Sequence, residues 1–244
     1  MKKYALILVA AFMAMAQSVS AQVDHDDFGV WTTVEVKKDF GKKFDISAEA
    51  ELRTQDYSQA VERWTIGLGA SYKLVSWLKA DIGYKFIDKQ QLQEVTRKGN
   101  VVDGYWSPRH RVYASLTGKV KFGRFEFSLR ERYQLTCRGE QYVTKWNAEG
   151  VEIDPERVNA KNESVLRSRL GVDWNIRKSP FTPFASCEMH NVISDNWEIE
   201  KLRWIIGTKY KFNKRHSIEV GYVFQDVNYD YKQHILSLGY CYKF

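Results

Sequence analysis

A carboxylate, a histidine and a serine lie close together in the stretch 188–194, and these are the residue types of a nucleophilic hydrolase. In such enzymes a histidine base activates a serine nucleophile while an acidic group orients the imidazole. Glu188 and His190 would share one face of an extended chain. Ser194 falls in the following loop, and nothing in the sequence brings it to His190. We therefore interpret His190 as part of a polar network, and we keep acyl hydrolysis as the alternative.

Arginine is the second residue type that could do chemistry, because guanidinium forks bind carboxylates and phosphates through two parallel hydrogen bonds. Arginines occur two residues apart in Arg130-x-Arg132 and in Arg167-x-Arg169. The candidate polar network comprises Arg53, Arg63, Arg111, Arg130, Arg132, Arg167, Arg169, Glu188 and Arg203. These side chains either brace the protein through ion pairs, which we favour, or bind small anions. With few nearby acids, we expect the four paired arginines to recruit a carboxylate or an external anion.

Other kinds of chemistry find little support. The three cysteines, Cys137, Cys187 and Cys241, are widely spaced and do not form a metal-ligand pattern. No glycine-rich phosphate loop follows a strand and opens a helix. The formal charge of +7 is a mild excess for 244 residues and does not indicate nucleic-acid binding. We expect no metal, no cofactor and no nucleic-acid partner.

The elements that position these residues show a period of two. In 44–53 the apolar residues Phe44, Ile46, Ala48, Ala50 and Leu52 alternate with polar ones. Such alternation over about ten residues predicts a strand long enough to cross a membrane at a tilt. Eleven segments follow this pattern: 27–37, 43–54, 62–73, 77–88, 108–120, 124–137, 163–177, 181–191, 200–212, 216–226 and 232–244.

The connections between these segments alternate in length, as they do in a transmembrane barrel. Short turns lie near 39, 75, 122, 179 and 214, whereas long loops cover 89–107 and 138–162. Aromatic residues end the apolar face beside the short turns, which is typical of a membrane boundary: Tyr72, Trp77, Phe122, Phe125, Phe181, Tyr210, Phe212, Tyr242 and Phe244. We predict an all-β, antiparallel, up-and-down transmembrane barrel. Because such barrels have even strand counts, we expect about twelve strands, with ten as the alternative.

The two ends of the chain predict where it goes. Lys2 and Lys3, an apolar stretch, and Val19-Ser20-Ala21 form a signal peptide over residues 1–21, and residues 22–244 then form one barrel domain. A terminal aromatic, Phe244, ends the last strand, as in proteins inserted by the barrel-assembly machinery. We predict an integral protein of the bacterial outer membrane with outer-membrane lipid around it. A secreted soluble β protein is the alternative.

Several short motifs resemble the DUF 2490 family, exported barrel proteins that are common in Bacteroidetes and have no assigned function. The motifs are Glu49-x-Glu51-x-Arg53, Arg130-x-Arg132, Arg167-x-Arg169, Pro183-Phe184-Ala185-Ser186-x-Glu188 and Arg203-x-x-x-Gly207-x-x-Tyr210. The resemblance implies fold and location but no activity. We therefore predict a non-enzymatic, porin-like barrel that is structural or that binds or passes small anionic solutes. A rim-located lipid-modifying enzyme, of the phospholipase or lipid A deacylase type, is the alternative.

Overall fold

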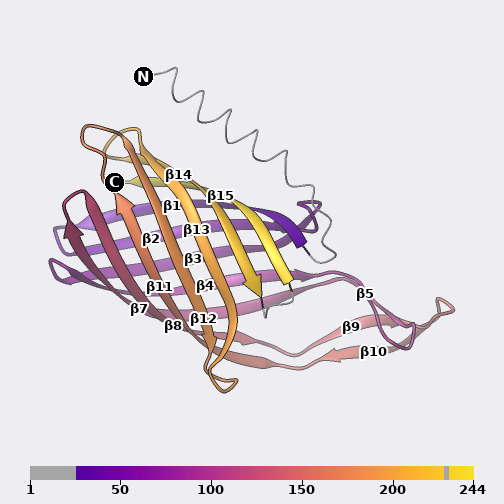
Figure 1. The fold of residues 1–244 in the computed structure, drawn as a ribbon. Helices are drawn as coiled ribbons and strands as arrows, with labels where there is room; N and C mark the ends of the chain where they lie inside the picture. The colour runs from indigo at the N-terminus through magenta and orange to yellow at the C-terminus, as the bar shows by residue number, and fades with distance from the viewer. Residues whose placement is uncertain (1–25, 228–230) are drawn as a thin grey trace.

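The computed structural model describes residues 26–227 and 231–244, and in it the chain forms a closed β-barrel (Figure 1). The predicted signal peptide, residues 1–21, lies outside the described residues. No helix in the described part of the chain is long and apolar enough to cross a membrane. The barrel strands coincide with the eleven predicted segments: β1 (Asp26–Phe40), β2 (Phe44–Gln55), β3 (Ala60–Val75), β4 (Leu78–Gln91), β7 (Tyr105–Phe122), β8 (Phe125–Arg138), β11 (Lys161–Trp174), β12 (Phe181–Val192), β13 (Glu198–Lys211), β14 (His216–Val227) and β15 (Tyr231–Lys243).

The predicted fold class is confirmed, but the barrel formed by the described residues has eleven strands, which differs from the expected twelve and from the alternative of ten. An odd count makes the first and last strands run in the same direction. β1 and β15 accordingly close the barrel as a parallel pair, from Asp26 opposite Lys232 to Lys37 opposite Lys243. All other neighbouring strands of the barrel are antiparallel.

The two long loops contain further short strands, which the sequence did not predict. They are β5 (Glu94–Val95), β6 (Val101–Val102), β9 (Gln141–Trp146) and β10 (Glu152–Val158). These strands form a separate four-stranded sheet in the order β10-β9-β6-β5 and do not join the barrel. Figure 1 shows this sheet extending beyond one end of the barrel, which we call the long-loop end. We call the opposite end the short-turn end.

The strands are staggered around the barrel. Paired residues lead from Asp26 on β1 through every strand in turn and return to β1 at Phe40, 14 residues further along the same strand. A stagger of this kind requires strands tilted by roughly 35–45° to the barrel axis. A row of paired residues therefore moves from the long-loop end towards the short-turn end as it passes around the wall from Asp26 to Phe40.

The outer wall is apolar. Ile66, Leu68, Ile82, Leu170 and Ile206 are each 56–64% exposed, and they belong to a much longer series of exposed large apolar side chains. A continuous apolar surface of this size is unfavourable in water, at about 25 cal/mol per Å². It is the surface that a bilayer core covers.

Aromatic side chains border this apolar wall at the short-turn end, as predicted. The rings of Phe181 and Tyr210 lie 4.7 Å apart, and that of Phe212 lies 4.8 Å from Tyr210. Tyr242 and Phe244 form a similar pair at 4.8 Å. Amphipathic rings prefer the boundary between hydrocarbon and headgroups, so this belt marks the membrane boundary near the short turns.

The long-loop half of the lumen is filled with side chains. Several inward positions carry apolar residues, although the alternation predicts polar ones there. These apolar residues are among the most buried in the described chain: Trp31, Ile87, Val165, Val223 and Ile235. Trp31, Val223 and Ile235 pack against one another and against Ile205. This half of the barrel therefore has a packed core of its own, into which polar residues are set.

Candidate functional site

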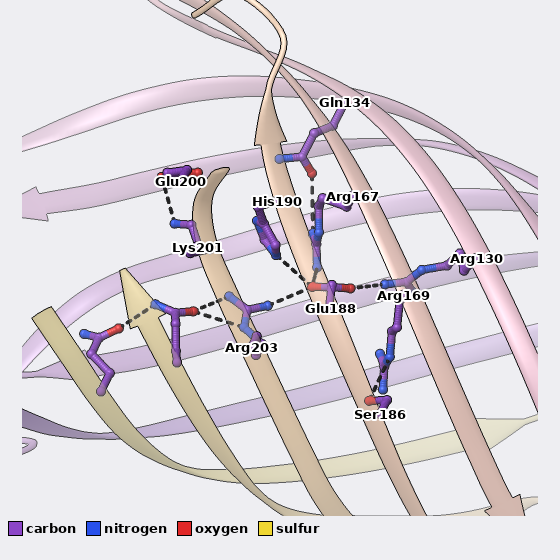
Figure 2. A network of polar contacts seen from close by, with 12 residues as sticks. Arg130, Gln134, Arg167, Arg169, Ser186, Glu188, His190, Glu200, Lys201 and Arg203 are labelled. Carbon is purple, nitrogen blue, oxygen red and sulfur yellow. Dashed lines mark hydrogen bonds and ion pairs between the residues drawn. The ribbon is translucent and has the colours of Figure 1, made fainter. Parts of the chain in front are cut away.

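Glu188 is the centre of the polar network inside the barrel, and its side chain is only 1% exposed. It points inward from β12 and receives Arg130 at 2.5 Å, Arg167 at 2.5 Å and Arg203 at 3.1 Å. His190 Nε2 lies 2.8 Å from Glu188 Oε1. Figure 2 shows Glu188 between Arg203 on one side and Arg130 on the other. One carboxylate thus gathers three guanidiniums and an imidazole.

The strand register explains why these residues meet. Arg130 pairs with Arg169, Arg169 with Glu188, and Glu188 with Arg203 on four successive strands. The same row continues through Gln225 and Gln233 to Asp27 on β1. Arg203 donates to Gln225 Oε1 through Nε at 3.0 Å, and Gln225 donates to Gln233 Oε1 at 2.8 Å. The network therefore follows one row of paired residues around the wall, and Arg167 and His190, which pair with each other, reach Glu188 from the adjacent row.

The four arginines of the two Arg-x-Arg motifs are direct neighbours. Arg130 lies opposite Arg169 and Arg132 lies opposite Arg167 across the β8–β11 ladder. Glu188 contacts Arg130 and Arg167, but within the described residues no carboxylate forms an ion pair with Arg132 or Arg169. Of the expected partners, a further carboxylate or an external anion, the described residues supply no carboxylate beyond Glu188 of β12.

Arg132 and Arg169 have other partners. The guanidinium of Arg132 lies over the ring of Tyr113 at 4.3 Å. Arg169 Nε donates to the hydroxyl of Ser186 at 3.1 Å. A ring face and a hydroxyl hold a guanidinium in place without neutralising it. Among the described residues, both arginines are therefore held by partners that carry no negative charge.

A second group of predicted residues lies around Trp31. Arg53 forms a two-pronged ion pair with Glu51, with both contacts at 2.8 Å. Its guanidinium also stacks over the Trp31 ring at 3.6 Å, and that of Arg203 approaches the same ring at 4.8 Å. Arg63 reaches Glu51 at only 3.9 Å. Trp31 thus links the Glu51 group to the Glu188 group.

Guanidinium groups outnumber the acids that could pair with them. Among the residues that the structure describes, Arg111 hydrogen-bonds only the hydroxyl of Thr136, at 2.9 Å. Within the described residues, the Nε–H groups of six arginines are buried without a hydrogen-bond partner: Arg63, Arg109, Arg130, Arg132, Arg138 and Arg167. A buried donor left unpaired costs about 1–3 kcal/mol, so the lumen has unused capacity for an anion or for ordered water.

On the short-turn side of this network, a cavity of about 550 Å³ occupies that half of the lumen. We call it the cup. Its wall includes Lys37, Ser47, Lys79, Thr117 and Lys209, and it reaches the short turn at Ser76. Its other end is lined by Arg130, Arg132 and Arg169, whereas Glu188, Arg203 and Trp31 do not line it. The cup therefore ends where the packed polar network begins.

The structure does not assemble a hydrolase site at His190. This residue points into the barrel, is 5% exposed and touches Glu188. The Ser194 hydroxyl instead accepts a hydrogen bond from the Ser164 backbone at 3.3 Å. His190 is thus close to Glu188, as the shared face predicted, but it lies among guanidiniums within the lumen and not at a lipid-facing rim.

Sequence reasoning missed Trp31, Tyr113 and Gln225. Trp31 and Tyr113 are large aromatics at inward positions, where the period of two calls for small or polar residues. That break in the alternation is the signal that could have identified them. For Gln225 no such signal exists, because a glutamine on an inward face is common in any polar lumen.

No curated protein sequence matches the chain significantly. Among solved structures, the translocator domain of the autotransporter NalP from Neisseria meningitidis is similar, with a TM-score of 0.58 and 12% identity over 93% of this chain and 92% of that chain. The beta domain of the Bordetella autotransporter BrkA has a TM-score of 0.53 and 12% identity, with 82% of each chain covered. At this identity the likeness concerns the fold alone.

The family described as "Protein of unknown function (DUF2490)" matches residues 28–235. This range contains all five motifs that resemble the family. In the structure, residues of these motifs meet inside the barrel, where Arg53 approaches Trp31 and Glu188 binds Arg130, Arg167 and Arg203. The chain belongs to the DUF2490 family.

Proposed function

We propose that the chain is exported by the signal peptide at 1–21 and that residues 22–244 form an outer-membrane barrel that binds small anions in its lumen. The apolar outer wall and the aromatic belt support the membrane location. By the usual arrangement of such barrels, the short-turn end faces the periplasm and the long-loop end faces the exterior. We also propose that the barrel-assembly machinery recognises the terminal Phe244.

The observation that carries the binding role is the charge imbalance around Glu188. This single carboxylate receives Arg130, Arg167 and Arg203. On the same two strands, Arg132 and Arg169 form no ion pair with a carboxylate among the described residues. Like charges in a restricted space repel one another by an amount that grows as the local dielectric constant falls. A bound anion would relieve this repulsion, and it would also use the unpaired Nε–H groups.

Binding is favoured over free passage because the lumen is closed across its long-loop half. Trp31 and Glu188 are each at most 9% exposed, as are Val223, Ile235 and Arg203 beside them. The bracing role that the sequence suggested is compatible with this arrangement, because the ion pairs of Glu188 join β8, β11, β12 and β13. No observation favours lipid hydrolysis at His190.

Two measurements on the purified barrel test this proposal. In planar bilayers we expect no sustained open-channel current, because the packed network blocks the lumen. In detergent we expect phosphate or succinate to raise the unfolding temperature saturably, since a ligand that binds only the folded state stabilises it. Chloride at equal ionic strength is the control. A steady large current would favour a pore, and identical behaviour in all three salts would overturn the binding role.

A further inference from the structure

The closed end of the cup has the features of a specific ligand site. We infer that a small oxyanion, either a carboxylate or a phosphate group, binds there between Arg132 and Arg169, with the rest of its molecule lying in the cup. This inference rests on the proposed anion-binding role and adds the place, the residues and the ligand class. The ligand would enter from the short-turn end, where the cup begins at Ser76.

Most charges nearer the mouth of the cup neutralise one another in pairs. The pairs are Lys37 with Glu35 at 2.9 Å, Lys79 with Asp81 at 2.8 Å, Lys119 with Glu126 at 2.6 Å, and Lys209 with Asp173 at 3.2 Å. Lys73 and Glu219 also line the cup there, one charge of each sign, and form no ion pair among the described residues. Arg132 and Arg169, at the closed end, have no carboxylate partner in residues 26–227 and 231–244. The attraction for an anion is therefore concentrated at the closed end and not spread along the wall.

The two arginines are spaced for one oxyanion. Because Arg132 pairs with Arg167 and Arg169 pairs with Arg130, Arg132 and Arg169 are diagonal neighbours on the inward face. Side chains in this relation lie about 7–8 Å apart at their bases. A single carboxylate or phosphate between them can accept charge-assisted hydrogen bonds from both guanidinium forks.

Each arginine is positioned by a neighbour that leaves donors available. Arg132 stacks on Tyr113, and its buried Nε–H has no partner. Arg169 uses its Nε for Ser186. Among the described residues, no hydrogen bond is found for the terminal nitrogens of either group. Tyr113 and Ser186 therefore act as positioning residues, and they also line the cup.

The remaining lining suggests the kind of molecule that carries the oxyanion. Phe184 lies in the cup wall with Lys209 Nζ 4.8 Å from its ring centre, and serines and a threonine line other parts. A volume of about 550 Å³ leaves room for a compact organic group beside the oxyanion. We therefore expect a small organic acid or a phosphate monoester and not a long polyanion.

The test compares two double variants of the full-length purified barrel. Arg132→Gln with Arg169→Gln removes the inferred site. Arg109→Gln with Arg138→Gln removes the same charge from a pair on β7 and β8 near the long-loop end, outside the cup lining. Binding of inorganic phosphate and of succinate is measured by calorimetry for both, next to the unmodified protein. We expect at least tenfold weaker binding for the Arg132/Arg169 variant and less than threefold for the Arg109/Arg138 variant.

The outcomes separate this inference from the proposed function. If the unmodified barrel binds neither anion, both fail. If it binds and the Arg109/Arg138 variant loses affinity while the Arg132/Arg169 variant keeps it, the anion role stands and the inferred site is overturned. Tighter binding of phosphate or of succinate identifies the ligand class within the inference. Should the double glutamine variant fail to fold, Arg132→Lys with Arg169→Lys keeps the charge and removes the forks, and unchanged affinity there also overturns the inference.

Discussion

At the scale of single residues, the barrel depends on a buried carboxylate among an excess of guanidiniums. Glu188 is 1% exposed and is shared by Arg130, Arg167 and Arg203. Desolvating these charges is costly, so the arrangement is favourable only while every partner is present. Replacing the central partner has more effect than replacing any surface charge, because three guanidiniums lose their anion at once.

Glu188→Gln tests this dependence. Removing one member of a buried ion pair costs about 3–5 kcal/mol, which for a domain of this size corresponds to roughly 6–20 °C in unfolding temperature. Glu152→Gln, at an exposed position of β10, should change nothing measurable. Phosphate should raise the unfolding temperature of the Glu188 variant more than that of the unmodified barrel, because it supplies the missing anion. Equal unfolding temperatures for the two variants would show that these arginines are simply hydrated.

His190→Gln tests the enzymatic alternative at the same scale. His190 is enclosed by Glu188 and the arginines that surround it, and Ser194 is hydrogen-bonded elsewhere. We therefore expect fatty-acid release from phospholipid vesicles to stay at background for both proteins. A catalytic base would instead show activity that falls by orders of magnitude in the variant, and that result would establish a lipid hydrolase.

At the scale of elements, small residues allow neighbouring strands and rings to approach closely. Gly207 on β13 lies where an added Cβ would be 2.5 Å from the Val220 carbonyl oxygen and 2.8 Å from both Gly221 Cα and Phe184 Cζ. Two of these neighbours belong to the backbone of β14, which cannot move without disturbing the ladder. The absence of a side chain at Gly207 thus leaves room for the buried ring of Phe184 to pack against β13 on the inner face of the wall.

Gly207→Ala should lower the free energy of unfolding by about 1–3 kcal/mol, the usual cost of overpacking a tight site. Gly118→Ala is the matched control, since a Cβ at Gly118 would meet nothing within 4 Å. Urea unfolding of the two variants in the same detergent measures the difference. Two variants of equal stability would mean that β13 and β14 separate easily at this point.

The parallel seam between β1 and β15 gives a second prediction for elements. Glu35 lies opposite Cys241 across this seam, and Glu49 lies opposite Glu35 one strand further away. Adjacent strands are about 4.8 Å apart, and this distance suits a disulfide. Residues separated by two strand spacings are too far apart to form one. Glu35→Cys should therefore form a disulfide with Cys241 on mild oxidation, and Glu49→Cys should not. Peptide mass spectrometry identifies the cross-link, and its absence in the Glu35 variant would contradict an eleven-stranded closure.

At the scale of the whole molecule, an apolar outer wall surrounds a lumen that is packed at one end and open as a cup at the other. The two halves differ because the inward apolar residues Trp31, Val223 and Ile235 gather at the long-loop half. Ion pairs and these side chains together close the barrel there. The cup is left near the short turns, whose inward positions carry lysines, serines and glycines.

Membrane assembly is tested at the last residue. Phe244 donates its backbone N–H to the Lys37 carbonyl at 2.9 Å and packs against Tyr242. If it also serves as the assembly signal, deleting it should reduce the heat-modifiable, outer-membrane fraction of the protein several-fold. Phe212→Ala, which removes another exposed ring of the aromatic belt, should have a smaller effect. Equal losses in both would assign Phe244 a role in the belt alone, and recovery of the intact protein in soluble form would contradict the membrane location.

The sequence by itself determined the strands, their faces and the fold class, because a period of two is a local property that each segment shows independently. It also grouped Glu188 with Arg130, Arg167 and Arg203 in one candidate polar network, and the described structure brings these residues together. The sequence contains eleven alternating segments but predicts an even number of strands, since nothing local reveals that β1 and β15 pair in parallel.

Only the tertiary structure decided which arginines are neutralised and which are not. Glu188 lies opposite Arg169 and Arg203 in the register, yet its carboxylate reaches Arg130, Arg167 and Arg203, while Arg169 turns to Ser186. These choices depend on side-chain reach across several strands and on the ring positions of Trp31 and Tyr113. The closure of one half of the lumen has the same origin, because packing across the barrel joins residues that are far apart in the chain.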